Sequence, residues 1–315
     1  MTYETVFGPV ESSRLGRSLG LDLLGAAICS FDCLYCESGR TVAHTLVRNP
    51  YVRSELILEE LGQWLKAPSG PVGHITLGGM GEPCLNSEMG AVINGVRKLA
   101  PDVPVAVLTN SSLLPDPLIR NELTRCQAVL PSLDTLIPKE FYRLNRPCAS
   151  LSLDDIAQSL LTFRSEFSGD IFLEILLVRG INDSQANLAA LTAFCRELVP
   201  DRVDVVTMTR PGAHIREGSV DAGVLQSWRK TLGGRTASNP GSERTGHEFE
   251  RTLTDLESSI ISSLKRRPQS RFQLGQALQA DPIQMEAVLS RLVEQGRIET
   301  QKAFDQLFYS LKAGR

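Results

Sequence analysis

The segment AAICSFDCLYCESGR, Ala26 to Arg40, holds three of the chain's 7 cysteines. Cys29, Cys33 and Cys36 are spaced as C-x3-C-x2-C, and no fourth cysteine follows nearby. Thiolates are soft ligands that suit zinc, copper(I) and iron–sulfur clusters. A structural zinc site normally has four protein ligands. Three thiols in one loop therefore favour an iron–sulfur cluster in which one iron stays open to another ligand.

The same loop has two other interpretations. A zinc site would take its fourth ligand from a distant cysteine, and the chain offers Cys84, Cys126, Cys148 and Cys195. Cysteines are also often buried as small apolar residues without any metal. The surrounding sequence therefore has to separate a cluster from a zinc site or a core.

The cysteine loop directly follows the first of six β-type segments, residues 18–25. The further predicted strands are 74–79, 103–110, 127–134, 170–178 and 202–210. Helical patterns alternate with them at 54–66, 87–100, 116–125, 153–167, 184–199 and 223–233. Strands joined by helical crossovers form a parallel sheet, which either closes partly into a barrel or lies open as a doubly wound sheet.

Distinctive polar and glycine residues gather where the predicted strands end. These residues are Gly79, Gly81, Glu82, Asn110, Ser132, Asp134 and Arg210, and Glu174 lies within an apolar strand. Ligands bind at the carboxyl ends of parallel strands, so we expect one site built from six loops. Each residue also has a local alternative role, as a turn glycine, a cap or a surface ion pair.

The composition changes after residue 233. Residues 235–251 are rich in Gly, Ser, Thr and charge, which is typical of a linker. Residues 252–315 predict three helices followed by a β-hairpin, the order of a winged helix-turn-helix domain. Nine Lys or Arg against seven acids make this domain mildly basic. The candidate recognition helix also carries Glu286 and Glu294, which favours docking on a protein or on its own barrel, residues 1–234, and leaves nucleic-acid contact as the alternative.

The composition and the N-terminal sequence bear on the cellular location and on the partners that the protein can have. The chain has 315 residues, 42% hydrophobic and 22% charged, and a net charge of −3, so no overall attraction to nucleic acid exists. No secretory signal and no apolar run of membrane-spanning length is seen. We therefore expect a cytoplasmic protein with no membrane partner, in which thiols stay reduced.

These features resemble the radical S-adenosylmethionine (SAM) superfamily, whose C-x3-C-x2-C motif follows the first strand of a partial barrel. Longer stretches resemble its tRNA wyosine synthase-like branch, the relatives of 4-demethylwyosine synthase. They include FGPVESSRLGRSLGLDL, CSFDCLYCESGRT, GGMGEPCLN, VLTNSSLL, RLNRP, LVRGINDS and RVDVVTMTRPGAH, spread in order over about the first 215 residues.

The resemblance implies an α/β fold, a partial (β/α)6 TIM-type barrel with a small C-terminal winged helix-turn-helix domain. It implies that Cys29, Cys33 and Cys36 bind a [4Fe–4S] cluster whose open iron binds SAM. Reductive cleavage of SAM would then yield a 5′-deoxyadenosyl radical, and this radical would abstract a hydrogen atom from a substrate. The electron would come from a donor of the flavodoxin or ferredoxin type.

The resemblance also implies roles for the other site residues. Tyr35 would lie beside the adenine, and Gly79, Gly81 and Glu82 would hold the methionine end of the cofactor. Polar groups for the rest of the cofactor would come from Asn110, Ser132, Asp134, Glu174 and Arg210.

Two alternative functions stay open. One is a tRNA-modifying enzyme of the wyosine type, although those enzymes carry a second cluster with upstream cysteines, and here Cys29 is the first cysteine. The other is a redox-sensing iron–sulfur regulator that binds DNA through the winged helix. A GGMGEP segment at the cofactor position favours the enzyme, since a sensor needs no cofactor cradle.

Overall fold

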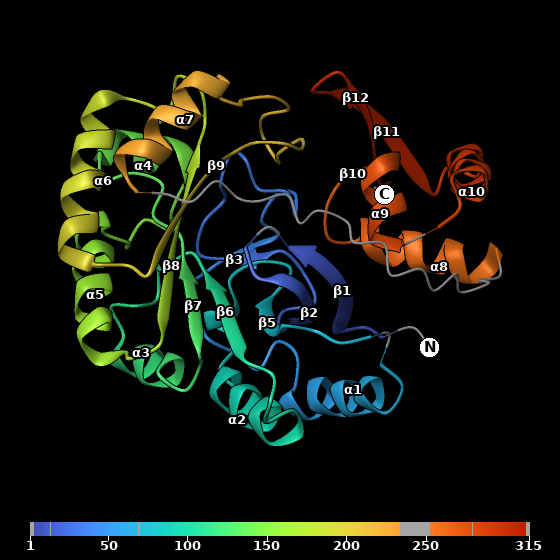
Figure 1. The fold of residues 1–315 in the computed structure, drawn as a ribbon, viewed down its shortest axis with the longest axis horizontal. Helices are drawn as coiled ribbons and strands as arrows, with labels where there is room; N and C mark the ends of the chain where they lie inside the picture. Colours follow the sequence, from blue (N-terminus) through green and yellow to red (C-terminus); the bar gives the residue numbers. More distant parts are fainter. Residues whose placement is uncertain (1–2, 13, 69, 234–252, 279, 313–315) are drawn as a thin grey trace.

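The computed structural model describes residues 3–12, 14–68, 70–233, 253–278 and 280–312. Its centre is a seven-stranded sheet with the strand order β1-β2-β5-β6-β7-β8-β9 (Figure 1). The strands are β1 Val6–Ser12, β2 Gly16–Asp22, β5 His74–Gly78, β6 Val105–Thr109, β7 Ala128–Pro131, β8 Asp170–Leu177 and β9 Arg202–Thr207. From β2 to β9 every neighbouring pair is parallel. The α/β fold with a parallel sheet is therefore confirmed.

The strand order distinguishes the two architectures that the sequence left open. In a doubly wound sheet the order reverses at a switch point, whereas these parallel strands follow one another in chain order. The helices lie outside the curved sheet (Figure 1). They are α1 Ser54–Lys66, α2 Met89–Leu99, α3 Pro117–Leu123, α4 Pro138–Leu144, α5 Leu153–Glu166, α6 Gln185–Leu198 and α7 Ala222–Thr231. This arrangement is consistent with a partial barrel.

Local signals explain where the helices begin. The Asp116 carboxylate accepts a hydrogen bond from the backbone N–H of Leu118, and Pro117 occupies the first turn of α3. Ser152 and Ser184 cap α5 and α6 in the same way. Two short elements were not predicted from the sequence. Helix α4 follows Ile137, which gives no side-chain cap, and the 3-10 turn η1, Pro83–Leu85, is too short to show a period.

Burial alternates along β8, and this alternation separates the two faces of the sheet. Leu173 and Ile175 are fully buried toward the helices, whereas Phe172, Glu174 and Leu176 between them are only partly covered. A separate small cluster of Leu15, Ala106, Ala128 and Leu130, with Leu108 and Phe172, packs on the inner face. The inner face is therefore filled by apolar side chains at one end.

The first strand, β1, was not predicted from the sequence. It pairs antiparallel with β2 and contains a register shift between Phe7 and Val10. The Glu60 carboxylate on α1 ties the chain before it, because it accepts hydrogen bonds from the backbone N–H groups of Glu4, Thr5 and Val6 at 2.8–3.2 Å and from the Thr5 hydroxyl at 2.6 Å.

We expect Glu60→Gln to lower the free energy of unfolding by about 2 kcal/mol at pH 7, the contribution of hydrogen bonds to a charged group. Burial alone would raise the pKa of Glu60, but the hydrogen bonds from Glu4, Thr5 and Val6 outweigh it and lower that pKa below its usual 4.5. A carboxyl group whose pKa is lower in the folded state than in the unfolded state stabilises the protein at pH values above its unfolded-state pKa. This stabilisation is lost as the pH falls through the folded-state pKa. Urea unfolding of both proteins should show the difference shrinking below pH 4.5; a constant difference down to low pH would contradict the prediction.

The C-terminal module, residues 253–278 and 280–312, has a core of its own. It contains α8 Leu253–Leu264, β10 Gln269–Ser270, α9 Arg271–Leu278, α10 Pro282–Glu294, β11 Ile298–Ala303 and β12 Gln306–Leu311. The three helices and the hairpin occur in the predicted order, and β10 adds a third strand, giving the order β10-β12-β11. The hairpin turns at Phe304 and Asp305, both with positive φ. The predicted linker, 235–251, lies outside the described residues.

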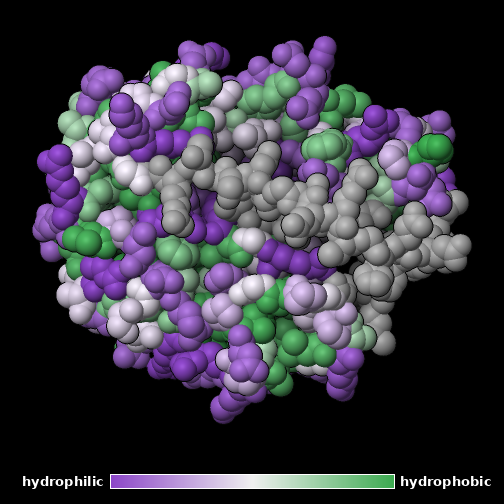
Figure 2. Space-filling view, in the orientation of Figure 1, coloured by the Kyte–Doolittle hydropathy of each residue, from purple (hydrophilic) through white to green (hydrophobic). Residues whose placement is uncertain are grey.

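The surface of the molecule is ordinary for a chain of this composition. Hydrophilic residues predominate along the left and lower rim in Figure 2, over the outer helices of Figure 1. Within the described part of the chain, no helix combines the length and the apolar character needed to cross a membrane.

Candidate functional site

The three cysteines lie in a loop that starts on a short strand. Cys29 ends β3, Ile28–Cys29, which pairs in parallel with β4, Ala43–His44. Within the loop, the backbone N–H of Cys36 donates to the carbonyl of Cys33 at 3.2 Å, which makes a tight turn between the second and third cysteines. The loop follows β2, at the carboxyl edge of the parallel strands, as the sequence predicted.

Asp32 fixes this loop to two other parts of the barrel. Its carboxylate accepts from the backbone N–H of Thr41 at 3.1 Å and lies 2.9 Å from Nε2 of His214 and 3.2 Å from a guanidinium nitrogen of Arg146. The backbone N–H of His214 also donates to the Leu34 carbonyl at 3.0 Å. The loops after β7 and β9 therefore hold the cysteine loop from both sides.

The thiols of Cys29 and Cys33 are held by N–H donors. Nδ2 of Asn110 and the backbone N–H of Phe31 lie 3.4 and 3.5 Å from Sγ of Cys29. Nδ2 of Asn145 lies 3.6 Å from Sγ of Cys33. Donors of this kind stabilise thiolates and are part of what tunes an iron–sulfur cluster, so the surroundings of these two sulfurs fit a cluster.

The electrostatics of the loop oppose free thiolates. Burial raises the pKa of all three thiols, and burial together with the charge of Glu82 raises the pKa of Cys29 to about 12. The charges of Cys29 and Cys36 also raise the pKa of Cys33, so the three sulfurs are electrostatic neighbours. Thiolates form at such a site when a bound metal supplies positive charge. The loop therefore suits metal binding better than nucleophilic catalysis.

A single zinc ion fits this arrangement less well. Among the residues that the structure describes, no group of three His, Cys, Asp or Glu side chains is arranged to hold one metal ion. A cluster of four irons holds its thiolates farther apart than one ion does, because each sulfur binds a different iron. Cys84 and Cys126, two of the proposed fourth zinc ligands, are buried in the hydrophobic core.

The segment after β5 can be built only with glycine at two positions. Gly79 and Gly81 have φ values of +107° and +83°, which favour glycine. A Cβ atom on Gly81 would lie 1.9 Å from the carbonyl oxygen of Ile28, next to Cys29. A Cβ atom on Gly79 would lie 2.9 Å from Cγ of Asp22. The backbone of this segment therefore runs directly against the strands that lead to the cysteine loop.

Glu82 is buried and is held entirely by the protein around it. Its carboxylate accepts from the backbone N–H of Cys84 at 3.1 Å, the Thr109 hydroxyl at 2.7 Å and the backbone N–H of Asn110 at 2.6 Å. A contact between this carboxylate and the cofactor stays a prediction. In the structure its hydrogen bonds join the segment after β5 to the end of β6, so Glu82 positions both Gly81 and Asn110.

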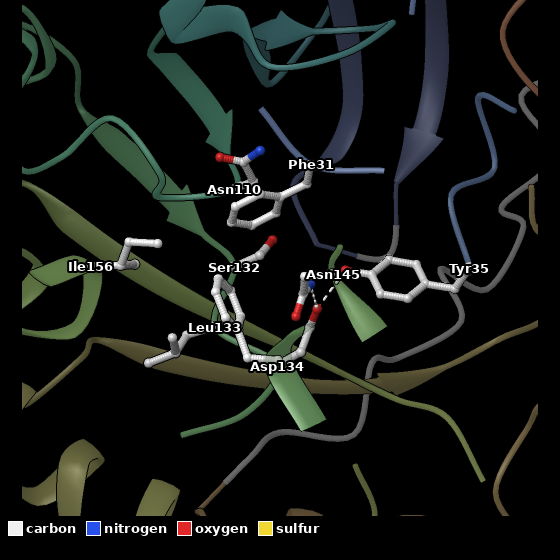
Figure 3. Close-up of a pocket in the computed structure, with 9 residues that line it drawn as sticks. Phe31, Tyr35, Asn110, Ser132, Leu133, Asp134, Asn145 and Ile156 are labelled. Carbon is white, nitrogen blue, oxygen red and sulfur yellow. Dashed lines mark hydrogen bonds between the residues drawn. The ribbon is translucent and has the colours of Figure 1, made fainter. Parts of the chain in front are cut away.

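Four predicted site residues line one pocket, shown in Figure 3. They are Tyr35, Asn110, Ser132 and Asp134, from the cysteine loop and the ends of β6 and β7. The pocket also contains five residues not predicted individually, namely Phe31, Leu133, Phe141, Asn145 and Ile156. In the sequence, Asn145 is marked only by its place in the stretch RLNRP. The four apolar residues cannot be told apart from ordinary core residues by sequence.

Asp134 organises this pocket (Figure 3). Its Oδ2 accepts from the Tyr35 hydroxyl at 2.5 Å and from Nδ2 of Asn145 at 2.8 Å, and its Oδ1 accepts from the backbone N–H of Leu176 at 2.9 Å. Burial raises the pKa of Asp134, and the hydrogen bonds from these residues oppose that rise. The Tyr35 ring is thereby oriented by a buried carboxyl group, with Asn145 bridging to the thiol of Cys33.

Glu174 and Arg210 lie outside this pocket and have partners of opposite charge. Glu174 on β8 lies 2.6 Å from Nε of Arg14, in the turn between β1 and β2. Arg210 lies 3.2 Å from the Glu37 carboxylate in the cysteine loop, and its Nε donates to Oε1 of Gln273 on α9 at 3.2 Å. These two residues therefore connect the site to the N-terminal turn and to the C-terminal module.

Comparisons with known proteins agree with this geometry. A UPF0026 protein of Synechocystis is 36% identical over 217 residues, which cover 69% of this chain and 80% of that protein. A protein named GTPase Obg from Brachyspira hyodysenteriae is 29% identical over 308 residues, 97% of this chain. The chain spans only 45% of that second relative. A radical SAM methyltransferase structure from Sphaerobacter thermophilus shares the fold, with a TM-score of 0.54, 17% identity and coverage of 68% of this chain and 62% of that one.

The match to a family model identifies the class of protein. A parallel barrel wall with a three-cysteine loop at its carboxyl edge is the framework of enzymes that combine an iron–sulfur cluster with SAM. The model of the radical SAM superfamily matches residues 25–191. The chain belongs to the radical SAM superfamily, whose enzymes use a [4Fe–4S] cluster and S-adenosylmethionine.

Proposed function

We propose that this enzyme binds a [4Fe–4S] cluster through Cys29, Cys33 and Cys36 and binds SAM at the iron without a cysteine. The observation that carries the proposal is the set of buried thiols with amide donors from Asn110 and Phe31 on Cys29 and from Asn145 on Cys33. When bound, the cluster and SAM supply one-electron chemistry that yields a carbon-centred radical for hydrogen abstraction. The remaining contacts assign roles to the chain's own residues.

The cofactor would lie between the cysteine loop and the segment Gly79 to Glu82. Gly79 and Gly81 bring backbone groups close to Ile28 and Asp22, which supports a role in holding the methionine end. Glu82 keeps that segment in place through its hydrogen bond to the backbone N–H of Asn110. In this proposal Glu82 positions Gly81 and Asn110, and a direct contact of its carboxylate with the cofactor is not required.

The pocket of Figure 3 would receive the nucleoside part of the cofactor and the substrate. Asp134 orients Tyr35, which supports the expected place of this ring beside the adenine. Ser132 and Asn110 add polar atoms at the ends of β7 and β6. The backbone of Glu174 bridges to that of Ser132, which brings this residue of the inner face beside the pocket.

We further propose the division into a barrel, residues 1–234, a linker, 235–251, and a winged helix-turn-helix domain, 252–315. The three helices and three-stranded sheet of the C-terminal module support it. The candidate recognition helix, α10, carries Glu286 paired with Arg271 at 2.7 Å, and its Arg291 pairs with Glu257. These internal pairs occupy the charges that phosphate contacts would need, which favours docking on the barrel over a DNA-binding regulator.

The proposal includes an electron donor of the flavodoxin or ferredoxin type, which enzymes of this superfamily generally need. A wyosine-type reaction on tRNA is a narrower form of the same chemistry, and co-purified tRNA that serves as a methylguanosine-dependent substrate would support it. The alternative function, a redox-sensing regulator, can be distinguished from an enzyme, because SAM would leave the EPR spectrum of a regulator's reduced cluster unchanged.

The test is reductive cleavage of SAM by the anaerobically reconstituted enzyme. We expect about four irons and four sulfides per chain, a changed EPR spectrum of the reduced cluster on addition of SAM, and 5′-deoxyadenosine that forms only with a reductant. A colourless zinc protein that forms no 5′-deoxyadenosine would overturn the proposal.

A further inference from the structure

Three arginines from distant parts of the chain gather beside the cysteine loop. Arg14 lies in the turn between β1 and β2, Arg210 follows β9, and Arg267 precedes β10 in the C-terminal module. We call these three residues the arginine cluster. The charges of Arg210 and Arg14 both act on Arg267, which places all three guanidinium groups in one electrostatic neighbourhood.

Two carboxylates hold the arginine cluster. Glu37, the residue after Cys36, lies 3.2 Å from Arg210 and 3.7 Å from Arg267. Glu174 lies 2.6 Å from Arg14. Glu37 is therefore shared between the barrel and the C-terminal module, directly beside the third cysteine.

The charges of this group do not balance. Arg210 and Arg267 share the single carboxylate of Glu37, which leaves one positive charge at this pair, whereas Arg14 is paired with Glu174. Asp204, another acid near Glu174, is paired with Arg202 at 2.7 Å.

Partial burial makes this imbalance costly. The Arg267 side chain is 36% exposed and the Arg210 side chain 18% exposed. Burial lowers the pKa of Arg267, Arg210 lowers it further, and Glu37 opposes this fall. Partly buried charges are normally paired, so one additional anion would complete the group.

The C-terminal module also closes the apolar side of the same region. Phe304, at the tip of its hairpin, shares a cluster with Tyr35, Leu34 and Leu176 of the barrel. The backbone N–H of Phe304 donates to the Glu217 carboxylate at 2.7 Å. Figure 1 shows this hairpin reaching toward the loop that follows β9. The module thus places an aromatic ring next to the pocket and a guanidinium group above the cysteine loop.

The same face of the module is fixed at a second point. The guanidinium group of Arg266 lies over the ring of Phe7 on β1 at 4.1 Å from its centroid. The Phe7 ring in turn covers Gly20, where a Cβ atom would lie 2.1 Å from Cζ of that ring. Arg267, the next residue, is therefore anchored over the barrel by its neighbour and does not depend on Glu37 alone.

We propose that the arginine cluster binds one negatively charged group of the substrate, a carboxylate or a phosphate, and that the C-terminal module completes this site with Arg267. The site lies beside the cysteine loop and the Tyr35 pocket, so an anion bound there would hold the rest of the substrate at the reacting centre. Guanidinium groups bind both carboxylate and phosphate in bidentate geometry. The proposal rests on the proposed function, because it names the substrate class for that site.

The test measures binding of small anions to the reconstituted holoenzyme by isothermal titration calorimetry. Inorganic phosphate and acetate serve as separate probes, and the tighter one identifies the group that the site accepts. We expect one site per chain and an affinity at least tenfold weaker in Arg267→Gln. Arg267→Lys, which keeps the charge, should recover part of the affinity. Binding of neither probe, or equal binding by wild type and Arg267→Gln, would overturn the proposal.

A variant with the opposite expected sign separates this effect from simple misfolding. Glu37→Gln removes the carboxylate that competes for Arg210 and Arg267, so the anion should bind several-fold tighter. Weaker binding in Glu37→Gln, with unchanged iron content, would contradict the site. Arg271→Gln is the matched control, since Arg271 is an exposed arginine of the same module that pairs with Glu286 away from the barrel; it should bind like wild type.

The two proposals fail in different ways. Anion binding with no reductant-dependent 5′-deoxyadenosine would leave the arginine cluster standing and reject the radical chemistry. Formation of 5′-deoxyadenosine by the wild type, with no anion binding, would keep the radical chemistry and reject the anion site.

Discussion

Cys33→Ala should abolish the cluster, and with it the formation of 5′-deoxyadenosine. The thiol of Cys33 is buried beside Cys29 and Cys36 and receives the Asn145 amide, so its loss removes a ligand that no neighbouring side chain replaces in the described structure. Residues that only support metal ligands cost about 10- to 100-fold when changed, so we expect a loss of about 100-fold or more. Iron and sulfide content and 5′-deoxyadenosine formation measure it.

Cys148→Ala is the matched control for this change. Cys148 is partly buried and lies close to the same loop, since its backbone N–H donates to the Ser30 carbonyl at 2.9 Å. Its thiol is not among the three proposed ligands, so iron content should equal that of wild type. An equal loss of iron in both variants would show that any cysteine change disturbs the loop, and would remove support for the three-cysteine assignment.

Gly81→Ala should cost about 3 to 5 kcal/mol of the free energy of unfolding, or displace the segment after β5. The new Cβ atom would lie 1.9 Å from the Ile28 carbonyl oxygen, a backbone atom that cannot move without shifting Cys29. The φ of +83° adds left-handed strain. Because the carbonyl of Ile28 also accepts from the backbone N–H of Glu82, SAM binding should weaken with stability. Urea unfolding and SAM titration measure the two effects.

Gly180→Ala separates the steric clash from the backbone strain. Gly180 has a φ of +70°, close to that of Gly81, but a Cβ atom there would meet nothing within 4 Å. The strain alone should cost about 1 to 2 kcal/mol and leave SAM binding unchanged. Equal effects of the two substitutions would mean that close approach to Ile28 does not matter.

The parallel strands could be predicted because burial on both faces leaves continuous apolar runs, as in 103–110. The edge strand β1 could not, because Val6 is its one buried side chain among those described and because it contains Pro9, which removes a backbone donor. The short helix α4 was missed for a different reason. It is as short as α3, but it follows Ile137, which gives no side-chain cap, whereas Asp116 marks the start of α3.

The candidate site divides in the same way. Cysteine spacing predicts Cys29, Cys33 and Cys36 as cluster ligands, since all three lie in one loop. The contacts of Glu82 with Thr109 and Asn110 depend on the register between β5 and β6, which the sequence does not show. Arg267 and Glu37 are 230 positions apart, so their proximity follows from how the C-terminal module docks.

The edge strand β1 has a consequence for the open form of the barrel. A sheet that does not close keeps an edge whose free backbone groups can recruit a strand from another molecule. Here the terminal strand carries Pro9 and a register shift between Phe7 and Val10, and the C-terminal module packs against it. Both devices make the edge a poor template for strand addition. The β1 edge of the barrel wall can therefore stay without a further strand and still resist strand addition from another molecule.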